Sequence, residues 1–261
     1  MKEEKSTTSI WSIPAKKKSF FNRFKLHKSK SMLFLTPPVI EDKCEGIILG
    51  GVKVKSILFS TDLAIIENTQ CDAVLAVYPF SPSLKIMKTL IDFCEKPVIC
   101  GVGGGVTKGK VSLDMAVAAQ NMGASAVIVN QPFKNSDLKK MRKLITIPII
   151  ASVSTTDFDF MGRLAAGTDI FNITGGVNTP NVIDKLLEDL PQVPFICTGG
   201  QSTGSLEKIL DKKPSAIVLT PPSGAGIFKD IMEGYRSVTT NSVNKINRIF
   251  IFIAKKIKLF K

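Results

Sequence analysis

The sequence predicts an α/β fold, a (β/α)8 barrel of TIM type with basic N- and C-terminal extensions, and three observations support this. From Leu33 onward, apolar runs of four to six residues alternate with helical segments, which is typical of βα units and a parallel sheet. The runs are apolar on both faces, as in strands covered by helices outside and filled by side chains inside. With 261 residues and 44% hydrophobic content, the chain is long enough for one such core.

Eight barrel strands are expected, and the first has three alternatives: Met32–Thr36, Gly46–Leu49 and Ser56–Phe59. Seven clearer runs follow at Ala73–Tyr78, Pro97–Cys100, Ala126–Val129, Pro148–Ala151, Ile170–Ile173, Pro194–Cys197 and Ala216–Leu219. Helical periodicity between them predicts helices at Leu84–Phe93, Ser112–Met122, Asp137–Leu144, Asp157–Ala166, Asn181–Leu190, Ser205–Leu210 and Gly226–Tyr235. This number of units favours a closed barrel over an open sheet.

The positive charge of the chain is confined to its two ends. The formal net charge is +13, but residues 1–31 hold nine Lys or Arg against two acidic residues, and residues 242–261 hold six against none. Residues 32–241 therefore carry twenty basic and twenty acidic side chains. This balance argues against a nucleic-acid groove on the barrel. We expect a disordered tail at 1–31, a barrel at 32–241 and a basic amphipathic helical tail at 242–261.

The C-terminal tail has two interpretations. Its apolar residues recur at helical spacing among lysines, and its longest apolar run, Ile249–Ala254, is too short to span a bilayer. The tail either packs on the barrel or on a neighbouring subunit of an oligomer, or it contacts a membrane surface through its apolar and basic faces.

Five cysteines without a Cys-x-x-Cys pair, together with the lack of a secretory apolar core in residues 1–31, predict a reducing cytoplasmic location. The only histidine, His27, lies in the N-terminal tail, so a Ser or Cys nucleophile on the barrel would have no histidine base. No residues show metal-ligand spacing, and no cofactor or metal is expected.

Two strand ends near the C-terminus predict an anion site. The last two runs end in Thr198-Gly199-Gly200 and in Thr220-Pro221-Pro222-Ser223-Gly224. Glycines let backbone N–H groups approach an anion, hydroxyls add donors, and a helix N-terminus favours negative charge. Because such barrels bind ligands at the C-terminal ends of their strands, we expect phosphate to be bound there by Thr198, Gly199, Gly200, Ser223 and Gly224.

Other strand ends carry neutral polar residues and glycines. Asn130, Asn172 and Thr174 would donate hydrogen bonds to charge that develops on an oxygen-rich ligand. The run Gly103-Gly104-Gly105 lacks the spacing of a dinucleotide fingerprint, so it is either an active-site loop or a tight turn. Cys100 lies on an apolar strand and is interpreted as a buried small hydrophobe.

Ionisable residues are scarce at these ends. Tyr78 and Lys108 are the candidates for proton transfer, and Asp62 and Asp157 also lie near strand ends. Each has a structural alternative. Tyr78 also fits core packing, Lys108 fits a solvated loop charge, and Asp157 fits the N-terminus of a helix.

The segments Ile147–Ala151, Ala166–Asn172 and Val193–Gly200 together resemble the second half of 2-keto-3-deoxy-6-phosphogluconate aldolases and related ribulose-phosphate-binding barrels. The resemblance covers residues 97–236. It implies that the turn after the seventh strand and the loop after the eighth bind a substrate phosphate. The position of the aldolase lysine is taken by Asn172, which cannot form an imine, so Schiff-base catalysis is not expected. From Leu35-Thr36-Pro37-Pro38 onward, the chain also looks like uncharacterised bacterial barrels labelled hydrolase.

These observations predict a barrel that binds a small phosphorylated sugar or keto acid. We expect non-covalent lyase or isomerase chemistry through an enolate-like intermediate, with Asn172 stabilising charge and Tyr78 or Lys108 transferring the proton. One alternative is a non-catalytic sensor or scaffold barrel that binds a phosphate ligand. Another is a hydrolase of unknown substrate.

Overall fold

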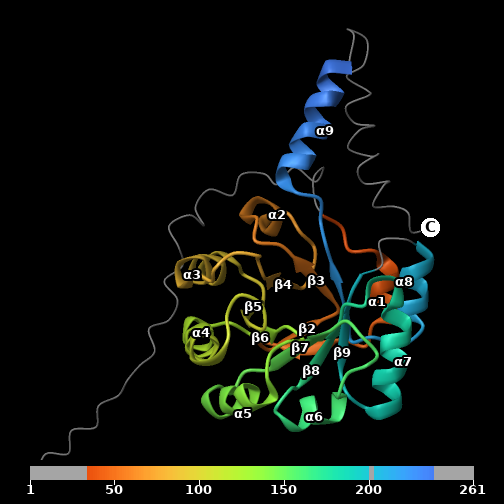
Figure 1. The fold of residues 1–261 in the computed structure, drawn as a ribbon. Coiled ribbons are helices and arrows are strands. Elements are labelled where there is room, and N and C mark those ends of the chain that lie inside the picture. Colours follow the sequence, from red (N-terminus) through yellow and green to blue (C-terminus); the bar gives the residue numbers. More distant parts are fainter. Residues whose placement is uncertain (1–33, 200–202, 238–261) are drawn as a thin grey trace, which may run out of the picture. The chain divides into compact units, whose positions relative to one another are not determined.

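In a computed structural model of the chain, eight parallel strands close into a barrel in the order β10-β3-β4-β5-β6-β7-β8-β9 (Figure 1). The structure describes residues 34–199 and 203–237. The barrel strands are β3 (Ser56–Phe59), β4 (Ala73–Ala76), β5 (Val98–Gly103), β6 (Ala126–Val129), β7 (Ile149–Val153), β8 (Ile170–Ile173), β9 (Phe195–Thr198) and β10 (Ala216–Leu219). The predicted (β/α)8 barrel is confirmed, and of the three alternatives for the first strand Ser56–Phe59 is the one that closes it. The predicted tails, 1–31 and 242–261, lie outside the described residues.

The barrel strands contain no charged residue and are buried on both faces. Alternate residues point inward and form an apolar filling that includes Ile57, Ile99 and Ile150, all fully buried. The residues between them point outward and pack under the helices, as do Phe171 and Ile149. The barrel is thus a filled core, and space for a ligand is expected only at its ends.

Helices surround the strands (Figure 1). They are α1 (Pro38–Lys43), α2 (Leu63–Glu67), α3 (Leu84–Phe93), α4 (Gly109–Met122), α5 (Asn135–Leu144), α6 (Phe160–Ala165), α7 (Thr179–Asp189), α8 (Thr203–Leu210) and α9 (Gly224–Ser237), with a 3-10 turn at Gly176–Asn178. In the described ranges, every helix is too short or too polar to cross a membrane. The N-terminus predicted at Asp157 is wrong by two residues: Asp159 caps α6, because its side chain accepts the Gly162 N–H at 2.7 Å.

A β-hairpin lies against the N-terminal ends of the barrel strands. Its strands, β1 (Ile47–Leu49) and β2 (Val52–Val54), are antiparallel, and the turn between them has positive φ at both Gly50 and Gly51 (56° and 80°). Such a two-residue turn favours glycine because L side chains avoid this conformation. The hairpin contributes fully buried apolar side chains to the inner filling, and the N–H of Gly46 donates to Ser215 O at 2.9 Å just before β10. It closes the end of the barrel opposite to the predicted site.

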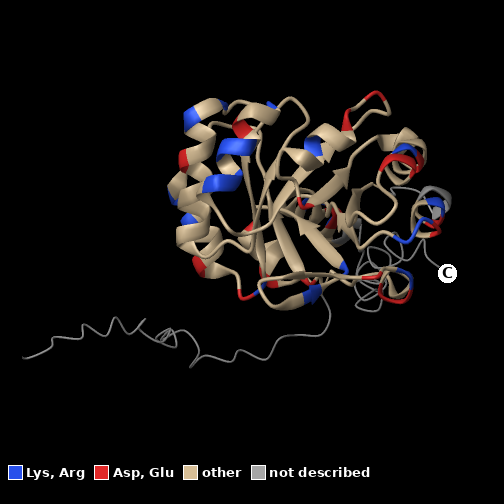
Figure 2. Ribbon diagram, turned by 90° about the horizontal axis from the view of Figure 1, so that it is seen from below, with Lys and Arg blue, Asp and Glu red and all other residues tan. Residues whose placement is uncertain are grey.

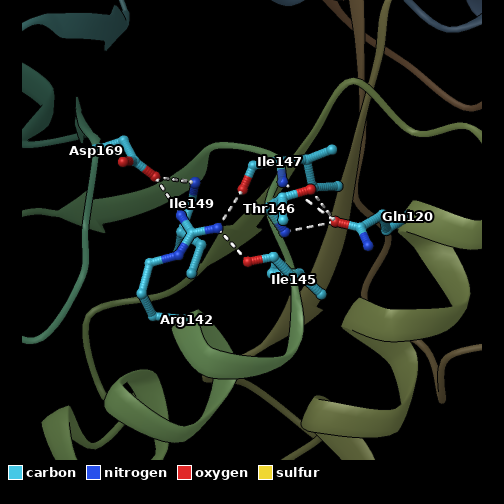
Figure 3. A network of polar contacts seen from close by, with 7 residues as sticks. All are labelled: Gln120, Arg142, Ile145, Thr146, Ile147, Ile149 and Asp169. Carbon is cyan, nitrogen blue, oxygen red and sulfur yellow. Dashed lines mark hydrogen bonds and ion pairs between the residues drawn. The ribbon is translucent and has the colours of Figure 1, made fainter.

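Side chains also fix the start of β7 (Figure 3). The carboxylate of Asp169 accepts hydrogen bonds from the N–H of Ile149 (2.7 Å) and from the Arg142 guanidinium (2.9 Å). The Gln120 amide oxygen accepts the N–H of Ile147 at 3.2 Å. These contacts provide hydrogen-bond acceptors for the backbone N–H groups of Ile147 and Ile149 at the start of β7. They stabilise the scaffold at the end away from the predicted site.

Charges of both signs are spread over the helices and connecting loops (Figure 2). Several of them form exposed pairs within one helix, such as Lys88 with Asp92 at 2.7 Å and Lys110 with Asp114 at 2.6 Å. Pairs of this kind contribute little to stability, about 0.3–0.5 kcal/mol each. The mixed surface agrees with the neutral barrel that the sequence predicts.

Candidate functional site

A hollow of about 150 Å³ lies at the C-terminal ends of the barrel strands. Its lining residues share one property, the absence of charge: Phe59, Leu75, Val77, Ile128, Asn130, Ser152, Asn172, Thr174 and Thr198. Phe59, Leu75, Val77 and Ile128 form its apolar part, and the amides and hydroxyls form its polar part. A ligand here would meet hydrogen-bonding groups in apolar surroundings, where such bonds are strong.

A row of three hydrogen-bonded side chains crosses the neighbouring strands β7, β8 and β9. The Asn172 amide donates to Ser152 Oγ at 3.1 Å, and its oxygen accepts from the Thr198 hydroxyl at 3.0 Å. Asn172 is 3% exposed and Ser152 8% exposed. Because both hydroxyls bind the amide, its orientation is fixed. One amide N–H of Asn172 and the hydroxyl hydrogen of Ser152 stay available as donors for a ligand oxygen.

Asn130 is held by the glycine loop that follows β5. The N–H of Asn130 donates to Gly103 O at 2.9 Å, and a β-carbon added to Gly104 would lie 2.6 Å from Asn130 O. Gly104 also has a φ of +91°. Only glycine tolerates this conformation at such a close approach. The loop therefore places Asn130 at the mouth, between the main hollow and a second one of about 70 Å³.

Tyr78 lines the smaller hollow, but its hydroxyl is engaged elsewhere. The Tyr78 oxygen accepts the N–H of Ser83 at 2.8 Å, at the residue that caps α3. This bond ties the loop after β4 to the start of α3. A general acid must lie within hydrogen-bond reach of the reacting group. The catalytic role predicted for Tyr78 stays a prediction that requires this loop to rearrange.

Lys108 lies just ahead of α4 and is exposed. It is absent from the lining of both hollows. Asn172, by contrast, lies in the main hollow and Tyr78 beside the smaller one. The structure thus brings the predicted hydrogen-bonding residues together, but it does not bring the two proton-transfer candidates to Asn172.

The residues predicted to bind phosphate lie at the edge formed by β9 and its neighbours. Thr198 faces the main hollow, and Thr174 lines it while its hydroxyl donates to Val153 O at 3.3 Å. Gly199 has a φ of +145°, which L side chains rarely adopt. Gly200 lies outside the described residues.

The edge continues at the start of α9. Ser223 caps this helix, because its hydroxyl oxygen accepts the N–H of Gly226 at 3.0 Å. Gly224 faces a carboxylate: a β-carbon placed on it would lie 2.5 Å from Asp62 Oδ2. The other carboxylate oxygen of Asp62 accepts the N–H of Ala64 at 2.9 Å and caps α2. Asp62, one of the scarce ionisable residues at the strand ends, therefore lies between two helix N-termini.

Arg163 is a residue whose role at the mouth the sequence did not reveal. Its side chain is 4% exposed, lies 5.3 Å from the ring centre of Phe158, and donates from Nη2 to the carbonyl of Gln131 at 2.9 Å. The Gln131 side-chain oxygen accepts the N–H of Ser154 at 2.8 Å. Burial lowers the pKa of Arg163, and nearby Asp159 opposes this shift. Arg163 and Gln131 join the loops after β6 and β7, a tertiary contact for which a lone helical arginine gives no signal.

The thiols of the barrel strands are not nucleophiles. Burial raises the pKa of Cys100 to about 12 and that of Cys197 well above its usual value. The thiolate is the reactive form, so these thiols stay inert near neutral pH. The prediction that Cys100 is a buried small hydrophobe is confirmed, since it is 1% exposed.

No protein-family model and no curated protein matches the chain. Solved structures do match. A phosphoenolpyruvate phosphomutase from Streptomyces platensis subsp. rosaceus is 10% identical with a TM-score of 0.57, over 80% of this chain and 95% of that one. A phosphonopyruvate hydrolase in complex with oxalate and Mg++ is 11% identical with a TM-score of 0.54, over 85% and 97%.

A 2,3-dimethylmalate lyase, described as a PEP mutase/isocitrate lyase superfamily member, is 12% identical with a TM-score of 0.53, over 78% of this chain and 92% of that one. At such identities the likeness concerns the fold. It supports an aldolase-type barrel in general, whereas the particular likeness to 2-keto-3-deoxy-6-phosphogluconate aldolase is not supported.

Proposed function

We propose that this barrel binds a small keto acid or phosphorylated sugar at its mouth and acts on it by non-covalent lyase or isomerase chemistry. The observation that carries the proposal is the row Ser152–Asn172–Thr198 at the main hollow. It offers two oriented donors, the Asn172 amide and the Ser152 hydroxyl, to one ligand oxygen. Such donors stabilise an oxygen on which negative charge develops, because they need no reorientation during the reaction.

The chemistry of proteins that share this fold supports the same proposal. The neighbours reported above are a phosphomutase, a hydrolase of phosphonopyruvate and a lyase of 2,3-dimethylmalate. Fold alone does not establish function, so the proposal depends on the residues of the mouth. In our proposal, Asn172 and Ser152 bind the carbonyl oxygen of the ligand, and Asn130 orients its other end. Tyr78 or Lys108 transfers the proton.

A magnesium ion does not fit the described part of this site. One neighbour was solved with oxalate and Mg++. Among the described residues, no group of three His, Cys, Asp or Glu comes together, and no carboxylate lines either hollow at the mouth. Magnesium prefers carboxylate and other oxygen ligands. In our proposal the neutral donors of the mouth, and not a metal ion, stabilise the developing charge.

Covalent lysine catalysis is also outside the proposal. No lysine lines either hollow in the described ranges, and the main hollow carries the Asn172 amide instead. An amide cannot form an imine with a keto acid. The proton is then removed from carbon while the carbonyl oxygen stays bound to Asn172.

Deuterium exchange tests both halves of the proposal. An enolate-forming site removes a methyl proton of pyruvate, and in D2O the carbon takes up deuterium, which proton NMR detects as loss of the methyl signal. We expect wild-type protein to bind pyruvate in calorimetry and to accelerate the exchange. Asn172→Leu should lose both, while Asn121→Leu, a change of an exposed amide on α4, should lose neither. Absence of pyruvate binding, or equal binding by Asn172→Leu, contradicts the proposal.

A non-catalytic sensor is the second candidate, and a specific observation favours it. The hydroxyl of Tyr78 is bound to Ser83, and Lys108 is exposed and lines neither hollow. No proton-transfer group in the described part of the chain therefore lines the main hollow beside Asn172. A sensor would bind pyruvate through Asn172 without exchanging its protons. The hydrolase alternative has the least support, since no nucleophile with a neighbouring base lines either hollow among the described residues.

A further inference from the structure

We infer that the smaller hollow is a subsite for an uncharged, apolar chain, so that the ligand of this barrel is a keto acid longer than pyruvate and without a second charge. The inference rests on the proposed function and concerns the hollow of about 70 Å³ beside the loops after β4 and β5. This hollow adjoins the main one, because Val77, Ile128 and Asn130 line both. A ligand bound to Asn172 in the main hollow can therefore extend past Asn130 into the smaller one.

A gap among the inward-facing side chains of the barrel opens the smaller hollow. On β5, Ile99 belongs to the inner filling and is fully buried. Because inward residues alternate along a strand, the next one is Gly101, which has no side chain. Gly101 pairs with Ile128 of β6, and a β-carbon added to it would lie 2.9 Å from Val77 Cγ2, just after β4. All three residues line the hollow, so the missing side chain of Gly101 leaves the space between the two neighbouring strands.

The lining of the smaller hollow carries no charge. Among the described residues that line it, the only polar ones are Tyr78, Thr107 and Asn130. The Tyr78 hydroxyl is already bound to the Ser83 N–H. No described cation of this lining is therefore present to pair with a carboxylate or a phosphate at this end of a ligand. A charged group placed here would lose hydration without gaining a charged partner, which is unfavourable.

Two exposed apolar side chains from different loops lie at the rim of the same hollow. Phe80, in the loop after β4, is 76% exposed, and Val106, in the loop after β5, is 69% exposed, yet both line the hollow. An apolar chain that enters the hollow would cover part of both side chains. Removing this apolar surface from water is favourable. The rim thus supports the same class of ligand as the uncharged lining.

Three keto acids and three variants test the inference by calorimetry. The ligands are pyruvate, 2-oxopentanoate, which has two more methylene groups, and 2-oxoglutarate, which ends in a second carboxylate instead of the methyl group of 2-oxopentanoate. Phe80→Ala removes an exposed side chain of the rim, and Gly101→Ala places a methyl group in the gap. Phe228→Ala is the matched control, because Phe228 is 65% exposed on α9 and lines neither hollow.

We expect wild-type protein to bind 2-oxopentanoate about tenfold more tightly than pyruvate, because both added methylene groups are buried. It should bind 2-oxoglutarate no more tightly than pyruvate. The ratio of the 2-oxopentanoate and pyruvate affinities should fall about threefold or more in Phe80→Ala and in Gly101→Ala, which remove or displace apolar contacts, and should be unchanged in Phe228→Ala. Comparing this ratio within each protein cancels any effect of a substitution on the keto acid end of the ligand.

The inference is overturned if wild-type protein binds 2-oxopentanoate no more tightly than pyruvate, or if it binds 2-oxoglutarate as tightly as 2-oxopentanoate. It is also overturned if Phe80→Ala and Phe228→Ala give the same ratio. Failure of the proposed function has a different signature, namely no binding of pyruvate by wild-type protein.

Discussion

The hydroxyl of Thr198 donates a hydrogen bond to Asn172 Oδ1 over 3.0 Å. Thr198 was predicted from the Thr-Gly-Gly turn after β9, and Asn172 from its place at the end of β8. Their contact links the turn that was predicted to bind an anion to the amide that was predicted to stabilise negative charge on the ligand. The Thr198 side chain therefore fixes the orientation of the Asn172 amide.

The first prediction concerns this contact. Thr198→Val keeps the shape of the side chain but leaves the buried Asn172 oxygen without its donor. The free energy of unfolding in urea should fall by about 1–3 kcal/mol. Affinity for pyruvate should fall with it, because the Asn172 amide is free to turn. Thr89→Val, at an exposed helix position where the hydroxyl bonds only Lys85 O, should change neither quantity appreciably. Equal effects of both substitutions would contradict the role given to Thr198.

The second prediction uses two neighbouring glycines. Gly104→Ala places a β-carbon 2.6 Å from Asn130 O at a positive φ, whereas at Gly105 the nearest atom, Asn130 Nδ2, is 3.6 Å away. Gly104→Ala should lower the free energy of unfolding by about 1–3 kcal/mol from backbone strain alone, and should weaken pyruvate binding by moving Asn130. Gly105→Ala should do neither. If the two variants behave alike, the glycine loop does not position Asn130.

The third prediction concerns the five thiols. Burial raises the pKa of Cys44, Cys71, Cys94, Cys100 and Cys197 above the ordinary 9.0. Ellman's reagent at about pH 8 should react slowly with half-buried Cys94 and with the other four only after unfolding. The folded thiols also stay protonated where unfolded ones ionise. Their contribution to stability should therefore be complete below pH 9 and decline as the pH rises toward 12. Rapid reaction of several thiols in the native protein would contradict the burial of these side chains.

The fourth prediction concerns the C-terminal tail, which lies outside the described residues. If residues 242–261 contact a membrane surface, the full chain should sediment with anionic liposomes and the chain shortened to residue 241 should not. High salt should weaken the association, since it depends partly on the lysines. Equal sedimentation of both forms favours the alternative, in which the tail packs on the barrel or on a neighbouring subunit.

The order of the barrel strands was predictable because each is a short apolar run bounded by turn residues. The start of the barrel was not. Ile47–Leu49 has the composition of a barrel strand. Only the two adjacent glycines that follow it, Gly50 and Gly51, indicate the tight turn of a hairpin. Local pattern identifies a strand, but it does not identify the strand's partner, which long-range hydrogen bonds decide.

The sequence predicted which residues line the candidate site better than it predicted which of them lie beside each other. Asn130, Asn172, Thr174 and Thr198 were predicted from their places at strand ends, and all four line the main hollow. The position of Asp62 beside Gly224 was not foreseen, because it depends on the adjacency of the first and last barrel strands. Contacts between residues so far apart in the sequence leave no local pattern.

The central claim, that Asn172 binds and polarises a keto acid at a mouth without charged lining residues, is tested most directly by following the methyl protons of pyruvate in D2O by NMR. The account predicts that wild-type protein accelerates their exchange, that Asn172→Leu does not, and that Asn121→Leu behaves as wild type. Exchange that proceeds equally with Asn172→Leu would contradict it, as would a wild-type protein that leaves the protons unexchanged at saturating pyruvate.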